Sequence, residues 1–176
     1  MIEIQEKANT IPQELSIAEI RKYTKEAAPL IHCITNPISI HDCANIILAA
    51  GARPIMAEHP AEVAEITAVA SALMLNLGNI TDARIESIQR ALKEANRRKI
   101  PVLLDLVGVT CSSLRREFAR KLLADGRFAV IKGNISEILA AADLPFHGTG
   151  IDAGSQDAIS QANEASYCTT AKKLAE

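Results

Sequence analysis

The sequence predicts an α/β protein with a mostly parallel central sheet between two layers of helices. Short apolar segments recur along the chain, and each is followed by a segment with helical periodicity. Because helices of this length separate successive strands, the strands cannot pair as hairpins and must be joined by crossover connections. The 176 residues are 48% hydrophobic, which is sufficient for one core of ordinary size. We therefore expect residues 1–176 to belong to a single domain.

Composition narrows the possible functions. The formal net charge is −2 and the charged residues are interspersed, so the chain lacks the basic stripe that nucleic-acid binding requires. No apolar stretch reaches the ~20 residues needed to cross a bilayer, and the amino terminus does not resemble a secretion signal. The four cysteines are scattered, which favours reduced thiols over a zinc site or disulfides. We expect a cytoplasmic protein without a nucleic-acid or membrane partner.

The first strand is expected over residues 30–34. A capping box of Ser16 and Glu19 predicts a helix before it, ending at about Ala27. The strand leads into Thr35-Asn36-Pro37, where the proline ends regular structure.

The next two strands are also bounded by helix signals. Apolar residues recur at helical spacing over 39–50, and Gly51 stands where a left-handed cap is expected. A very short strand over 54–56 follows. Pro60 can begin a helix that reaches Ala70, and a continuous apolar strand then runs from Ala72 to Leu77.

The second half repeats the alternation. Thr81 can cap a helix to about Arg98, and the strand over 101–105 ends in a carboxylate, Asp105. A helix over about 112–125 precedes the last strand, which ends at Lys132. A final helix is expected over 156–175, after a glycine-bearing segment, 147–154, that we interpret as a flexible surface turn.

Polar residues follow the strands of this predicted sheet. Because parallel strands point their carboxyl ends to one rim, these residues should gather there although they are distant in sequence. Two carboxylates, a lysine and helix amino termini suit a hydrated Mg²⁺ held against polyphosphate, which favours phosphoryl transfer. A nicotinamide-binding glycine turn and a Walker loop are both missing from the expected places. The rim residues are Thr35, Asn36, Met56, Asn76, Asp105, Lys132, Asn134 and Glu137.

Several of these residues also have a purely structural interpretation. Asn134 and Glu137 have the spacing of a helix capping box, and as an exposed cap the pair would contribute only about 1 kcal/mol. Asp105 can cap the turn that follows it, and Met56 can be ordinary core. His32, inside an apolar strand, is more typical of a hydrogen-bonded core residue than of a base. The other histidines, His41, His59 and His147, have no ligand spacing and are expected at the surface.

The sequence resembles the hydroxyethylthiazole kinase family of the ribokinase-like superfamily. The resemblance covers about 30–142 in uninterrupted order. It rests on the segments His32-Cys33-Ile34-Thr35-Asn36, Leu48-Ala49-Ala50-Gly51-Ala52-Arg53-Pro54-Ile55-Met56-Ala57, Leu75-Asn76-Leu77-Gly78, Pro101-Val102-Leu103-Leu104-Asp105-Leu106-Val107-Gly108 and Ile131-Lys132-Gly133-Asn134-Ile135-Ser136-Glu137-Ile138.

The resemblance implies a ribokinase-like α/β/α fold and the phosphorylation of 4-methyl-5-(2-hydroxyethyl)thiazole by ATP with Mg²⁺ in thiamine salvage. It also implies a homotrimer. Carried over by position, Met56 and Asn36 would contact the thiazole. Asp105 and Glu137 would support Mg²⁺, and Lys132 and Asn134 would contact ATP.

Three departures from the family pattern affect these expectations. Leu106 replaces a proline, and Lys132 stands where arginine is more frequent, which keeps the charge and loses the bidentate fork. The chain also stops before the segment that carries the family's anion hole, so we expect a domain incomplete at its C-terminus, with the group that activates the alcohol beyond Glu176. An active kinase of this type, a related alcohol kinase and an inactive remnant that binds ligands or subunits are the alternatives.

Overall fold

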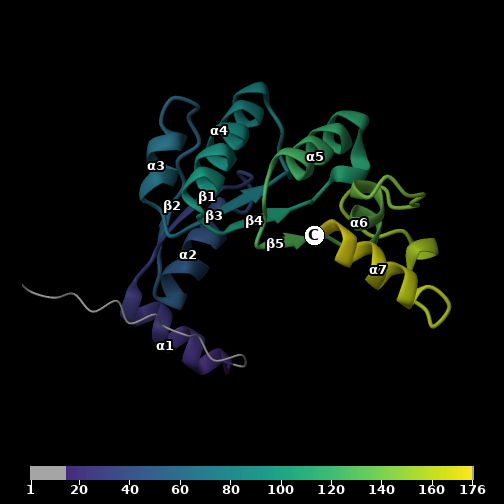
Figure 1. Cartoon of the computed structure of the whole chain (residues 1–176), viewed down its shortest axis with the longest axis horizontal. Coiled ribbons are helices and arrows are strands. Elements are labelled where there is room, and N and C mark those ends of the chain that lie inside the picture. Colours follow the sequence, from purple (N-terminus) through teal and green to yellow (C-terminus); the bar gives the residue numbers. More distant parts are fainter. Residues whose placement is uncertain (1–14, 176) are drawn as a thin grey trace, which may run out of the picture.

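Five parallel strands form one sheet in the order β2-β1-β3-β4-β5 (Figure 1). The structure is a computed structural model that describes residues 15–175. The strands are β1 Leu30–Ile34, β2 Arg53–Ile55, β3 Ala72–Asn76, β4 Val102–Asp105 and β5 Val130–Lys132. The helices are α1 Ile17–Ala27, α2 Ile40–Ala50, α3 Val63–Val69, α4 Asp82–Arg98, α5 Ser113–Asp125, α6 Ile135–Ala141 and α7 Glu164–Ala175, with short 3₁₀ turns η1 Val109–Cys111 and η2 Ser155–Asp157.

The predicted fold class is confirmed, since every strand pairing in the sheet is parallel. The register aligns Asn76 of β3 with Asp105 of β4, and Asp105 with Lys132 of β5. Three of the predicted rim residues therefore stand side by side at the carboxyl ends of three neighbouring strands.

The main core lies between the sheet and the helices α3, α4 and α5, which cover one face together (Figure 1). Ile34, Leu75 and Leu104 contribute to it from three adjacent strands and are fully buried. Ile88 of α4 and Phe118 of α5 close it from the helix side. Burial of such side chains contributes about 1.5–3 kcal/mol each, so this face supplies much of the stability of the fold.

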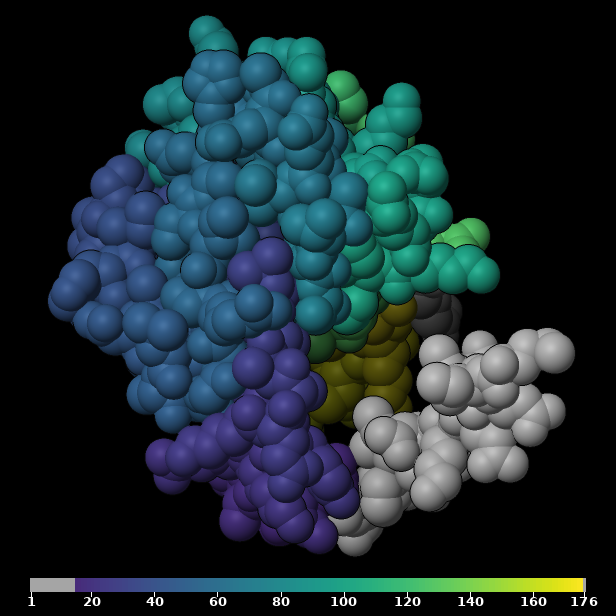
Figure 2. All heavy atoms as spheres, turned by 90° about the vertical axis from the view of Figure 1, so that its left-hand side faces the viewer, coloured from purple at the N-terminus to yellow at the C-terminus, as the bar shows by residue number. Residues whose placement is uncertain are grey.

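The opposite face of the sheet is less completely covered. On this face α2 contacts β2 at one edge, and α7 contacts β5 at the other. Between these edges Met74 and Leu103 pair across β3 and β4 and are half-buried, and Val130 of β5 is 50% exposed. Figure 2 shows the molecule from the side of β2, where residues of α3 and α4 form the upper part of the surface and α1 the lower part.

Four helix caps are present, of which three were predicted and the Ser112 cap was not. Ser16 and Asn134 each form both bonds of a capping box, while Thr81 and Ser112 accept a backbone N–H from the first turn of α4 and α5. Gly51 ends α2 at φ 96°, and a Cβ there would lie 2.3 Å from Cγ of Lys25, so both the left-handed conformation and the close helix contact favour glycine.

Two helices begin later than the sequence predicts. α3 starts at Val63 rather than at Pro60, since His59 accepts the N–H groups of Ala61 and Glu62 in a separate turn. α7 starts at Glu164, because the Asn163 side chain binds Ser160 N and Ala158 O and competes with helix formation there. Among the described residues, none of the helices has the length and apolar character that a membrane span requires.

Candidate functional site

A row of hydrogen-bonded polar side chains runs along the carboxyl ends of the strands. Asn36, two residues after β1, donates its Nδ2 to Oδ1 of Asn76 at 3.1 Å. Asn76 at the end of β3 donates to Oδ2 of Asp105 at 3.2 Å, and Lys132 Nζ lies 3.2 Å from both oxygens of Asp105. The structure thus brings together four predicted rim residues from four strands of the sheet.

Asp105 is the charged centre of this row. It is buried in an otherwise apolar strand, and its Oδ1 also accepts the backbone N–H of Val107 at 3.2 Å. That bond shapes the turn after β4, so the structural interpretation of Asp105 is correct alongside its place in the row. Lys132 balances the charge with a side chain that remains 63% exposed, which leaves its ammonium group accessible to a ligand.

Glu137 holds two segments of backbone together. Its Oε2 accepts Asn134 N at 2.8 Å, completing the capping box, and its Oε1 accepts Gly108 N at 2.9 Å. The residue is only 2% exposed, so the expectation of an exposed cap is wrong. The reason is the loop after β4, which folds over the start of α6 and buries the carboxylate there.

Asn134 belongs to the cap and to a neighbouring loop. Its Oδ1 accepts Glu137 N at 2.9 Å, whereas its Nδ2 donates to the carbonyl of Ile151 at 3.0 Å. The carbonyl of Gly150 accepts the Thr110 hydroxyl at 2.7 Å, so the segment 147–154 lies against both η1 and α6. The segment is a surface turn as expected, and these bonds fix its position.

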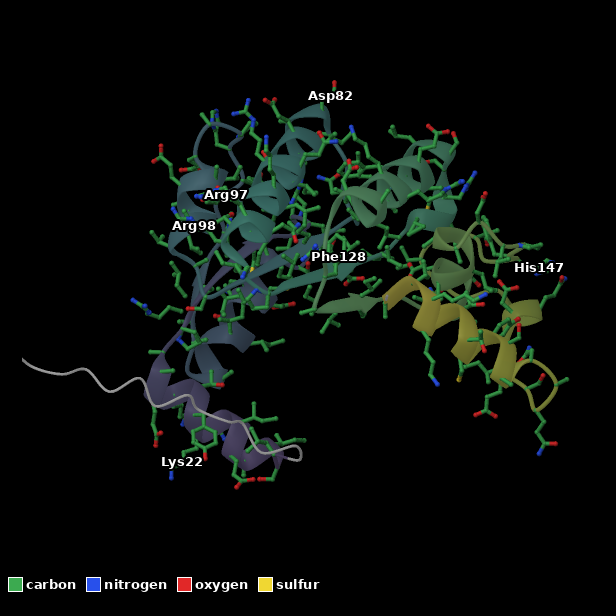
Figure 3. The ribbon with its side chains drawn as sticks, viewed as in Figure 1. Lys22, Asp82, Arg97, Arg98, Phe128 and His147 are labelled. Atoms are coloured by element: carbon green, nitrogen blue, oxygen red, sulfur yellow. The ribbon has the colours of Figure 1, made fainter. Side chains whose placement is uncertain are left out.

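A buried carboxylate that the sequence did not single out, Asp157, anchors the same segment. It accepts Ser136 Oγ at 2.5 Å, His147 N at 2.7 Å and the His147 ring Nδ1 at 2.7 Å. Burial raises the pKa of Asp157, but the hydrogen bonds from Ser136 and His147 outweigh it and leave the pKa below its ordinary value. His147 projects at the edge of the molecule beyond α6, as Figure 3 shows, and is 53% exposed, which agrees with its predicted surface position.

Two arginines in the first turns of helices also reach the rim. Arg84 of α4 donates to the carbonyl of Thr35, and Arg115 of α5 donates to the carbonyls of Leu77 and Gly78. Sequence reasoning missed both. A cation in the first turn opposes the helix dipole, so its position there is a signal that the side chain has a polar partner elsewhere.

His32 is a core residue, as predicted. It is fully buried, with Nδ1 2.8 Å from the Thr67 hydroxyl and Nε2 2.8 Å from the carbonyl of Ala57. Burial lowers the pKa of His32, which keeps the ring neutral, while the bond to Ala57 and the charge of Glu62 oppose that shift. Its bond to Ala57 fixes the segment directly after Met56.

Met56 lies at the same end of the sheet but outside the hydrogen-bonded row. It follows β2, the edge strand, and is half-buried. Strands β1 and β3 separate it from Asp105 of β4. Its thioether can supply an apolar wall for a ligand at this edge.

The side chains of the polar row fit a hard divalent cation such as Mg²⁺ only in part. Within residues 15–175, no group of three or more His, Cys, Asp or Glu side chains gathers in a way that could hold a metal ion. Mg²⁺ in proteins commonly takes one or two carboxylates and fills its other positions with water and phosphate oxygens. Asp105 therefore fits a metal that arrives with phosphates.

The fold and the rim together define the class: a parallel α/β protein whose polar side chains gather at the carboxyl ends of the strands, the place where open α/β sheets bind their ligands. The chain belongs to the hydroxyethylthiazole kinase family, whose family model matches residues 21–175. The predicted family resemblance is confirmed.

Individual relatives agree with the family match. The chain is 54% identical over 145 residues to hydroxyethylthiazole kinase 2 of Clostridium botulinum (strain 657 / Type Ba4), and 43% identical over 152 residues to the hydroxyethylthiazole kinase of Alkaliphilus metalliredigens. These alignments cover 82% and 86% of this chain, and 55% and 52% of the two relatives. The chain therefore spans about half the length of the curated relatives that it matches.

A solved structure shows the same fold. The hydroxyethylthiazole kinase protein from Pyrococcus horikoshii OT3 superposes with a TM-score of 0.68 at 34% sequence identity. The similar region covers 71% of this chain and 49% of that chain.

Proposed function

We propose that this chain supplies the substrate and metal side of a kinase that transfers phosphate from ATP to the hydroxyl of 4-methyl-5-(2-hydroxyethyl)thiazole, in thiamine salvage. One observation carries the proposal: the continuous polar row from Asn36 to Lys132 at the strand ends. The family membership gives the substrate class, and the row gives a place where an alcohol and a metal-bound phosphate would meet.

In this proposal the thiazole lies at the β1 and β2 end of the row. Met56 offers a soft apolar surface, and Asn36 offers amide hydrogen bonds for the polar atoms of the small ring. Asn36 is held by the N–H groups of Ile38 and Ser39, at 3.0 and 3.1 Å, so its side chain is already oriented before a substrate binds.

The metal and the phosphates lie at the β4 and β5 end. Asp105 would hold Mg²⁺, which supplies charge stabilisation of the transferring phosphoryl group when bound. Lys132 would contact ATP as a compact positive charge, in place of the bidentate contact that an arginine makes.

Glu137 and Asn134 contribute in a different way from Asp105. Both Glu137 oxygens already accept backbone N–H groups, so a metal would meet this carboxylate only at its remaining lone pairs. Glu137 mainly holds the Gly108 loop next to the first turn of α6. Asn134 would contact ATP through the second hydrogen of its Nδ2, because its Oδ1 accepts Glu137 N and the other hydrogen is donated to the carbonyl of Ile151.

A phosphorylation assay tests the proposal. The 176-residue chain is incubated with the thiazole alcohol and MgATP, next to a form extended to the length of the relatives, and the product is quantified by ³¹P NMR. Formation of the thiazole phosphate by the extended form, abolished by Asp105→Asn, is the expected result. Preference for a hydroxymethylpyrimidine or a sugar would instead support a related alcohol kinase.

A second candidate is ligand binding without turnover by the 176-residue chain. It is favoured by the Asn36 amide, which is already oriented by Ile38 N and Ser39 N and can bind a ligand without a catalytic group. Thiazole binding by the chain, without product, would support this candidate, and product formation would exclude it.

The oligomeric state and the cellular location follow from the same proposal. We infer a homotrimer in the cytoplasm, as the family resemblance implies. Light scattering of the purified extended form gives the mass that checks the trimer.

A further inference from the structure

Asn76 lies at the centre of the polar row and makes three hydrogen bonds within it. Its Oδ1 accepts Gly78 N at 2.9 Å and Asn36 Nδ2 at 3.1 Å, and its Nδ2 donates to Asp105 at 3.2 Å. The residue is only 5% exposed. It therefore joins the proposed thiazole end to the proposed metal end from a buried position.

The orientation of the Asn76 amide is fixed by the backbone. The N–H of Gly78 can only donate, so it must face Oδ1, and Nδ2 must then point at the Asp105 carboxylate. The Asn36 amide is fixed in the same way, since its Oδ1 accepts the N–H groups of Ile38 and Ser39. Both donors consequently point along the row toward Asp105.

Glycine at position 78 permits this close approach. A Cβ there would lie 2.8 Å from Oδ1 of Asn76 and 3.0 Å from Nδ2 of Asn36. A larger residue would displace one of the two amides. The backbone at the end of β3 is thus shaped around the junction between Asn36 and Asn76.

We propose that Asn76 is a positioning residue that couples Asn36 to Asp105, so that metal binding at one end of the row strengthens thiazole binding at the other. The proposal rests on the function proposed above. Hydrogen bonds in a row polarise one another. A cation bound to Asp105 makes its carboxylate a weaker acceptor for Asn76 Nδ2, and Asn76 Oδ1 in turn becomes a weaker acceptor for Asn36 Nδ2. Asn76 then holds Asn36 less tightly, and the Asn36 amide becomes more available to the substrate.

Coupling of this kind is reciprocal and is measured as a ratio of dissociation constants. Thiazole binding is measured by calorimetry in the presence of the non-hydrolysable β,γ-imido analogue of ATP, in EDTA and in saturating MgCl₂, for the wild-type chain and for Asn76→Ala. We expect Mg²⁺ to tighten binding about fivefold or more in the wild type. In Asn76→Ala the ratio should fall to about one while the variant still binds thiazole. An unchanged ratio in the folded variant would overturn the proposal.

Asn96 provides a matched control. Its side-chain amide also both donates and accepts, to Leu92 O and from Arg127 N, each at 3.0 Å, but lies at the end of α4 away from the rim. Asn96→Ala should keep the wild-type ratio. If Asn76→Ala is unfolded by circular dichroism, Asn76→Leu is measured instead, because it keeps approximately the size of the side chain but cannot donate to Asp105.

A measurement without ligand separates this inference from the proposed function. The side-chain amide signals of Asn36 are followed by ¹H–¹⁵N NMR. Asp105→Asn should shift them in the wild-type background and leave them in place in the Asn76→Ala background. Absence of the shift in the wild-type background overturns the coupling. If the shift is present while no thiazole binds, the proposed substrate is wrong and the coupling stands.

Discussion

The backbone N–H of Gly108 donates to Oε1 of Glu137 at 2.9 Å, and this bond joins the loop after β4 to the first turn of α6. The other carboxylate oxygen caps α6 through Asn134 N. One buried side chain therefore determines how the two segments on the proposed phosphate side lie relative to each other.

Glu137→Gln should lower the free energy of unfolding by about 2 kcal/mol. The amide places an NH₂ group against one of the two backbone donors, which leaves a buried N–H without an acceptor. This is more than the loss of about 1 kcal/mol that an exposed cap would give. Urea unfolding measures the change.

Glu19 is the matched control, since it forms the same capping box with Ser16 at the exposed start of α1. Glu19→Gln should change the unfolding midpoint much less than Glu137→Gln. Equal changes in the two variants would mean that the loop contact of Glu137 adds nothing to the cap.

Lys132→Ala should weaken ATP binding tenfold or more, because it removes a charged contact worth about 1.5–3 kcal/mol. Its stability should change by less than about 1 kcal/mol, since the pair with Asp105 involves a largely exposed ammonium group. Calorimetry with MgATP measures the affinity. Lys132→Arg should bind ATP about as well as the wild type. Lys121→Ala on α5 is the control and should leave ATP binding unaltered. An equal loss of affinity in Lys121→Ala and Lys132→Ala would contradict a direct contact between Lys132 and ATP.

Asp157 should make the fold sensitive to acid. The pKa of Asp157 is lower in the folded state than its ordinary value of 3.8. The ionised carboxylate therefore stabilises the fold fully above pH 3.8, and this stabilisation is lost as the pH falls through the folded pKa. The protection of residues 147–154 against hydrogen exchange, measured by mass spectrometry relative to the intrinsic exchange rate at each pH, should therefore fall in acid in the wild type. Asp157→Asn should show fast exchange already at neutral pH, whereas Asp152→Asn, at an exposed position of the same loop, should behave like the wild type. Slow exchange in Asp157→Asn would exclude its role as the anchor.

His32 should produce a second pH dependence at higher pH. Because its folded pKa lies below 6.5, the unfolded chain takes up a proton first, and stability should decline as the pH falls below that value. His32→Gln should be less stable at pH 8 and should lose this slope in urea unfolding. His41→Gln, on the exposed side of α2, should retain it. If the decline in stability with falling pH persists in His32→Gln, another titrating group causes it.

The sequence alone predicted the order of the helices and strands and most of the residues at the rim of the sheet. Asn36, Asn76, Asp105 and Lys132 end or follow strands, and parallel topology alone brings such residues together. The partners of these side chains could not be read in the same way. The burial of Glu137 depends on how a distant loop folds, and the anchoring of 147–154 by Asp157 depends on a contact with Ser136 across 21 positions.

The proposal that one connected row at the strand ends holds both ligands is tested most directly by NMR mapping. The thiazole alcohol and MgATP are titrated separately into the ¹⁵N-labelled chain. We expect thiazole to shift the Asn36 and Asn76 side-chain signals, and MgATP to shift the Gly108 amide and the signals around Lys132. Shifts confined to the opposite end of the sheet, where Lys99, Pro101 and Phe128 line a pocket of about 230 Å³, would contradict it.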